Sequence, residues 1–211
     1  MKKSFLILVL FVTFGFQCEQ ECTTFVSREY ELDLRNLVQK QYSLNDSIIV
    51  FKDIDSKLLL KNGDLFDNSN MSINFSLILL KIRSDFGAID SGYVYFDADL
   101  KNSSVNEISS LKDDVVRKYS LNCNDLSCSF NLTLIPKAKG IYCLGFIDLG
   151  NFGNFSECED NKLTCLISDG NNNYHDLVKS PYPRMWVDTK RTRISIENPA
   201  SRNDLYFFEV K

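Results

Sequence analysis

The chain has 211 residues, a net charge of −4 and 44% hydrophobic residues, of which the aromatic ones alone make up 12% of the chain. This composition suits one large or two small domains with a proper core, and it excludes a largely disordered chain. A modestly acidic chain is also a poor candidate for nucleic-acid binding, which requires clustered Lys and Arg. The only basic cluster, residues 190–193, adjoins the alternating Ile194 and Ile196 and is predicted to be the solvent side of a strand.

The N-terminus carries an export signal. Two lysines precede an apolar run over residues 5–16, and Glu19 follows soon after it. A run of about twelve residues matches the apolar part of a secretory signal peptide, whereas a membrane span needs about 17–25. We therefore predict that residues 1–17 are removed, which leaves 194 residues with a net charge of −6.

The signal ends at a cysteine, in Phe14-Gly15-Phe16-Gln17-Cys18. This segment resembles the loose lipobox of Bacteroidota lipoproteins, although Gln17 replaces the small residue of a strict lipobox. The acidic start that follows resembles the surface-export signals of some of these proteins. The resemblance implies that Cys18 is acylated, that residues 18–27 form a tether, and that the protein sits in the outer membrane, with surface exposure favoured. The alternative is an ordinary signal peptide with a small-residue cleavage site.

The cysteine count is odd, at seven, which leaves one thiol over in a secreted protein. If Cys18 takes the lipid, six cysteines remain that can pair: Cys22, Cys123, Cys128, Cys143, Cys158 and Cys165. The two pairs that are close in sequence, Cys123–Cys128 and Cys158–Cys165, are each predicted to staple a hairpin, and Cys22 would then pair with Cys143. A zinc site is not expected, because these spacings fit metal ligation poorly and the compartment is oxidising.

Hydrophobic periodicity predicts strands along the whole chain. Alternation of period two, typical of strands with one solvent face, occurs at residues 29–35, 71–77, 128–134 and 193–197. More continuous apolar runs, typical of central or doubly covered strands, occur at residues 47–51, 93–96, 141–147 and 205–210. With turn signals between the runs, the sequence predicts an all-β fold: an antiparallel, immunoglobulin-like β-sandwich over residues 28–211 with at most one short helix. A division into two small domains near residues 100–112 stays open.

Two local features qualify this scheme. The apolar positions change from odd to even numbers near Ile78-Leu79-Leu80. Since a strand cannot swap faces without an extra residue, we predict a bulge or a passage between sheets there. Ser110 and Asp113 could cap a short helix, with a loop leading into a strand as the alternative.

No catalytic or cofactor motif is found in the sequence. His175 stands beside Asp176, but no G-x-S-x-G nucleophile motif accompanies them. The stretch 169–173 begins like a calcium loop and lacks the glycine and glutamate that an EF-hand needs, so only a looser calcium site stays open. We therefore predict no catalytic residue, no metal ligand and no cofactor.

A candidate binding surface is predicted in the segment 180–186. Prolines hold this segment extended, and it contains Tyr182 and Trp186. Tyr and Trp are favoured in binding surfaces, which makes these two side chains the candidates. The alternative is that Trp186, the only tryptophan, belongs to the core.

The sequence thus predicts an envelope-anchored, non-enzymatic binding or accessory lipoprotein. The expected partners are the membrane, through the lipid, and an envelope protein or a glycan. One alternative is a carbohydrate-active hydrolase with a pair of carboxylates across a cleft. Another is a secreted eukaryotic glycoprotein, for which N-x-S/T sequons begin at Asn45, Asn70, Asn74, Asn102, Asn131 and Asn154.

Overall fold

The computed structural model describes residues 26–35, 37, 39–69, 71–82, 89–101, 105–109, 115–123, 127–146, 150–153, 159–168, 172–178, 184–188 and 193–211. Several residues named above lie outside these ranges: Cys18, Cys22, Ser110, Asp113, Cys158, Tyr182 and the sequon residues Asn70, Asn102 and Asn154.

A large main sheet is built from strands of the whole chain. Its members are β1 (Val26–Asp33), β2 (Gln41–Tyr42), β6 (Ser72–Ile82), β7 (Ile89–Ser91), β9 (Val105–Ser109), β10 (Val116–Asn122), β12 (Gly140–Phe146), β13 (Gly150–Phe152), β14 (Glu159–Leu166) and β17 (Leu205–Val210). The order is β1-β14-β13-β6-β12-β17-β2; β7 and β10 also pair with β6, and β9 pairs with β10. Two pairings in this sheet, β1 with β14 and β17 with β2, are parallel.

A smaller sheet and two hairpins complete the β structure. The second sheet has the order β3-β11-β8, from β3 (Ile48–Asp55), β8 (Phe96–Leu100) and β11 (Ser127–Pro136). One hairpin joins β4 (Lys57–Leu59) to β5 (Leu65–Asp67), and the other joins β15 (Arg184–Asp188) to β16 (Arg193–Glu197). Helical segments are short: η1 (Gly92–Tyr95), α2 (Tyr174–Leu177) and η2 (Pro199–Ser201). Over the described residues, the predicted all-β sandwich with at most one short α-helix is confirmed.

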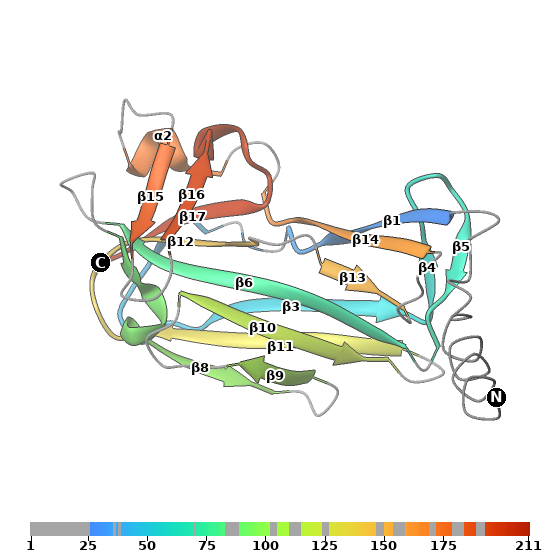
Figure 1. Ribbon diagram of the computed structural model, residues 1–211. Helices are drawn as coiled ribbons and strands as arrows, with labels where there is room; N and C mark the ends of the chain where they lie inside the picture. The colour runs from blue at the N-terminus through green and yellow to red at the C-terminus, as the bar shows by residue number, and fades with distance from the viewer. Residues whose placement is uncertain are drawn as a thin grey trace, which may run out of the picture.

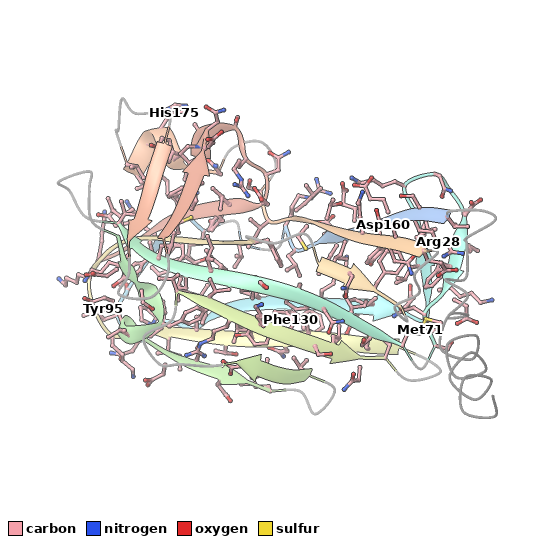
Figure 2. The ribbon with its side chains drawn as sticks, viewed as in Figure 1. Arg28, Met71, Tyr95, Phe130, Asp160 and His175 are labelled. Carbon is pink, nitrogen blue, oxygen red and sulfur yellow. A yellow bond between two sulfur atoms is a disulfide. The ribbon has the colours of Figure 1, made fainter. Side chains whose placement is uncertain are left out.

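The core fills the space between the two sheets. Phe75 of β6 lies at its centre, with ring centroids 5.7, 5.0 and 6.0 Å from those of Tyr119, Phe130 and Phe146. Such edge-to-face and tilted ring pairs stabilise a core beyond their buried area. Figure 2 labels Phe130, which reaches into this layer from β11. Strands from both sides of residues 100–112 pair in both sheets, and this one core draws on both halves of the chain.

Strand β6 is buried on both faces, and this explains the change of phase in its sequence. Its register with β10 and β12 runs without a shift, so the predicted bulge or passage between sheets is wrong. Leu77 and Leu79 face the sandwich core, whereas Ile78 and Leu80 face a second cluster on the other side of the main sheet. The odd-to-even change marks the point where a second layer covers the strand.

The second layer consists of the C-terminal part of the chain. Tyr174 of α2 and Ile196 of β16 pack with Leu205 and Phe207 over the main sheet. Figure 1 shows α2 and the β15–β16 hairpin above this sheet at the end where the chain terminates. Asn172 fixes the entry to α2, since its Nδ2 donates to the carbonyls of Pro199 and Arg202 while its Oδ1 accepts from the Tyr174 amide.

One other local prediction differs from the structure, and an open alternative is decided. Residues 93–96 do not form a strand, because η1 occupies Gly92–Tyr95 and β8 begins at Phe96. Gly92 lies so close to β6 that a Cβ there would meet the Leu79 backbone at 2.8 Å, which explains why this position is a glycine. Of the two alternatives for the segment after Ser110, the loop leading into a strand fits the described part, because residues 116–122 form β10.

The cysteines follow the sequence prediction only in part. Cys123 and Cys128 form the predicted disulfide. Cys143 and Cys165 are free and buried, so the predicted pairs Cys22–Cys143 and Cys158–Cys165 are wrong. Cys165 faces the sandwich core from β14, and Cys143 faces the second cluster from β12, so each thiol is enclosed by apolar side chains. The count of six pairable cysteines therefore no longer supports acylation of Cys18.

Both free thiols are expected to resist alkylation in the folded protein. Burial raises the pKa of Cys143 and of Cys165, with the negative charge of Asp204 adding to both shifts. Because the thiolate is the reactive form, iodoacetamide should modify neither residue at neutral pH in the native state and both in denaturant. Peptide mass spectrometry measures this directly, and labelling of either thiol in the native protein would show that it is not enclosed as described.

Candidate functional site

The outer face of the three-stranded sheet combines exposed apolar side chains with unpaired polar atoms. Ile49 and Phe51 of β3 point away from the core and are 48% and 38% exposed. Across the sheet from them, β11 places Thr133 opposite Ile49 and Asn131 opposite Phe51. We call these four residues the outer sheet face. Large side chains exposed side by side on a flat sheet are typical of a surface that binds a partner.

Two polar atoms on this face have no hydrogen-bond partner: Asn131 Oδ1 and Thr133 Oγ1. The Thr133 side chain is only 4% exposed, although its neighbours Leu132 and Leu134 are the ones that face the core. Buried polar atoms are nearly always paired, because an unpaired one costs about 1–3 kcal/mol. Both atoms are already shielded from solvent, so the surface that this face offers to a partner consists of the exposed Ile49 and Phe51 side chains.

Acidic side chains surround the outer sheet face. Asp53 and Asp55 continue along β3, and Asp97 and Asp99 lie on β8, with Asp99 opposite Thr133. All four are exposed. Asp97 pairs with Lys137 at 2.8 Å. The face thus has an apolar centre with a polar, negatively charged rim, which is the general layout of a protein interface.

The sequence predicted this region only in part. Residues 128–134 were expected to have a wet face that included Asn131 and Thr133; both lie on the outward side of β11, but Thr133 is buried there and Asn131 only partly exposed. The run 47–51 was expected to form a central or doubly covered strand, and this is wrong, because Ile49 and Phe51 are 48% and 38% exposed. The run is apolar on both sides of the strand, so periodicity could not distinguish the core side from the outer side. Only the pairing of β3 with β11 brings these residues beside the polar pair.

The structure separates the histidine from its acidic neighbour. His175 lies in α2 with its ring 5.7 Å from that of Tyr174 (Figure 2). Asp176 instead pairs with Lys40, whose Nζ is 2.5 Å from Asp176 Oδ2, and this contact lowers the pKa of the aspartate. The two residues are neighbours in sequence and take part in different contacts.

The loose calcium site finds no support in the described part of its segment. Residues 169–171 lie outside the described ranges. The side chain of Asn172 is buried, and its carbonyl oxygen is already engaged by the Tyr174 amide. Asn173 Nδ2 donates to the Phe207 carbonyl. Among the described residues, no cluster of His, Cys, Asp and Glu could hold a metal ion.

The predicted aromatic surface is placed only through its backbone. Trp186 lies in β15 opposite Ser195, in the hairpin next to α2, and the structure describes its backbone alone. Tyr182 lies outside the described residues. Of the basic cluster, Arg193 begins β16 as expected for a strand. The Tyr182–Trp186 surface and the lipidation of Cys18 therefore stay predictions.

Where the pKa of a described carboxyl group is shifted, it is lowered. Hydrogen bonds from Arg35 lower the pKa of Asp33 to about 2, and hydrogen bonds from Ser69 lower that of Asp67. A glycosidase acid needs the opposite shift, which burial away from cations produces. Asp33, Asp67 and Asp176 therefore do not fit the acid of such an enzyme.

No known protein family model matches the chain, and no curated protein matches it either. Among the residues that the structure describes, no helix is long and apolar enough to cross a membrane. Function has to be inferred from the chain's own residues.

Proposed function

We propose that the protein is a lipoprotein anchored to the bacterial envelope through Cys18, and that it acts as a non-enzymatic binding protein. The anchor rests on the N-terminal sequence, in which a short apolar run ends at Cys18. Acyl chains on that cysteine would hold the protein at the membrane, since each buried CH₂ contributes about 0.8 kcal/mol.

The outer sheet face carries the binding part of the proposal. The single observation behind it is that Ile49 and Phe51, two large apolar side chains, are 48% and 38% exposed on the same face of β3, beside exposed aspartates. A partner that covers Ile49 and Phe51 would remove their exposed apolar surface from water. A few residues at the centre of a protein interface, often aromatic, commonly contribute most of the affinity once a partner buries them.

The charge of the rim favours a protein partner with a basic surface. Asp53, Asp55 and Asp99 place negative charge around the apolar centre, so a complementary partner is positively charged. Such complementarity mainly raises the association rate and makes it sensitive to salt. Between the two partner classes expected from the sequence, this favours an envelope protein over a glycan.

Site-specific photo-crosslinking in intact cells tests the proposal. A benzophenone amino acid at position 51 should give one discrete adduct with a basic envelope protein. The same amino acid at Val94, which is also an exposed apolar residue but lies in η1, should not give that adduct. Asp53→Asn with Asp99→Asn should lower the adduct yield, whereas Asp64→Asn on the β4–β5 turn should leave it unchanged.

Two results would overturn the binding proposal. The first is identical adducts from positions 51 and 94, or none from either. The second is binding of the purified chain to an envelope polysaccharide that Phe51→Ala abolishes, which would identify a glycan in place of a protein partner.

A further inference from the structure

The β4–β5 hairpin exposes two leucines that face each other across its strands. Leu59 and Leu65 are paired in the register and are 63% and 68% exposed. Their neighbours Leu58 and Leu60 are buried, which fixes the hairpin against the body and directs the exposed pair outward. The two side chains together form a contiguous apolar patch. Exposed patches of this kind often mark a surface that contacts a membrane or another protein.

The hairpin is held directly against the start of β1. The Lys61 amide donates to the Glu29 carbonyl at 2.9 Å, and Lys61 Nζ lies 2.7 Å from Glu29 Oε1. Beside this contact, the Arg28 guanidinium lies over the Phe66 ring at 5.2 Å. Figure 1 shows β1, β4 and β5 together at one end of the molecule, opposite the end that carries α2.

The distance to the proposed anchor is short. Seven residues lie between Cys18 and Val26, where β1 begins. Even a fully extended chain over this interval spans at most about 28 Å. A lipid on Cys18 would therefore keep the β1 end of the molecule, and with it the hairpin, close to the membrane surface.

We propose that Leu59 and Leu65 form a second membrane contact, in which the tip of the β4–β5 hairpin enters the interfacial region of the lipid bilayer. This inference rests on the proposed anchor at Cys18. Insertion of two leucines would remove their exposed surface from water and would orient the body on its short tether. The outer sheet face would then be held at a fixed angle to the membrane.

The charges of the hairpin specify the kind of lipid surface. Residues 57–67 contain Lys57 and Lys61 and also Asp64 and Asp67, so the segment has no net charge. Lys57 lies opposite Asp67, next to the leucine pair. The contact should therefore form on zwitterionic phosphatidylcholine and change little with salt, unlike the binding of a polybasic segment to anionic lipid.

Quenching of tryptophan fluorescence by brominated lipid tests this contact. The full-length protein with Trp186→Phe and Leu65→Trp is purified from membranes and reconstituted in vesicles of brominated phosphatidylcholine. The introduced tryptophan should lose fluorescence relative to vesicles without bromine, and adding Leu59→Asp should reverse that loss. The matched control is Val94→Trp in the same background, since Val94 is 52% exposed and should stay unquenched.

The mass of the N-terminal peptide from the same preparation separates the two proposals. An acylated Cys18 with no quenching at position 65 overturns the hairpin contact and leaves the anchor standing. Equal quenching at positions 65 and 94 also overturns it, because the body would then lie on the membrane without a preferred end. A peptide without lipid overturns both proposals.

Discussion

Phe75→Ala is expected to lower the free energy of unfolding by about 4 kcal/mol, within the range for deleting a buried aromatic ring. Phe75 is 3% exposed and touches the rings of Tyr119, Phe130 and Phe146, which come from three different strands. Its removal leaves a cavity that these neighbours cannot fill together. Urea unfolding without reductant measures the loss as a lower midpoint with an unchanged slope.

The matched control for this change is Phe51→Ala. The Phe51 ring lies on the opposite side of the small sheet and is partly in water, so its removal should destabilise the fold by only about 1 kcal/mol. If both variants lost the same stability, the two sides of the β3-β11-β8 sheet would not differ as the structure describes. The modest loss in Phe51→Ala also makes this variant usable in binding experiments.

Leu80→Ala is expected to lower the free energy of unfolding by about 3 kcal/mol, as for a fully buried leucine. The Leu80 side chain is wholly buried, in the cluster that lies between the main sheet and α2. Leu79→Ala, on the core side of the same strand, should lose a similar amount, because Leu79 is equally buried. The comparison therefore tests whether β6 is covered on both faces.

A different outcome would indicate a two-layer sandwich without the second layer over β6. If Leu80→Ala changed the stability by less than about 0.5 kcal/mol while Leu79→Ala lost about 3, the even-numbered face of β6 would be open to solvent. The layer of α2, β16 and η2 would then not be packed on the main sheet. Urea unfolding of the two variants, measured side by side, decides between the two arrangements.

The amino-acid pattern predicts local structure well where one face is wet and less well where both faces are apolar. The alternation over 128–134 identified β11 and also the side on which Asn131 and Thr133 lie. In β6 the same alternation changed phase, and the sequence could not show that a distant segment around α2 and β16 covers the second face. Such coverage depends on contacts between residues far apart in the chain.

The cysteines show the same limit. The Cys123–Cys128 pair was predictable because its two residues are close in sequence and the disulfide closes one tight turn. Cys165 and Cys143 were each predicted to pair with another cysteine, but both are buried as free thiols. Which layer each of them faces depends on the order of the strands in the sheet, and the sequence does not show that order. The pairing of β3 with β11, which assembles the outer sheet face, also could not be predicted from the sequence.

The position of the β4–β5 hairpin is a further feature that the sequence did not reveal. Residues 57–67 contain four leucines, two on each face of the hairpin. Their apolar character alone does not distinguish the buried pair from the exposed pair. The structure distinguishes them and places the exposed pair beside the start of β1. With that placement, the proposed lipid on Cys18 would also affect the orientation of the whole molecule.

The central claim is that Cys18 anchors this protein to the membrane, and the intact mass of the mature N-terminal peptide tests it most directly. The peptide from protein purified out of its native membranes is predicted to begin at Cys18 and to carry a diacylglyceryl group. A mature chain that begins at another residue, or a Cys18 without lipid, would contradict the account.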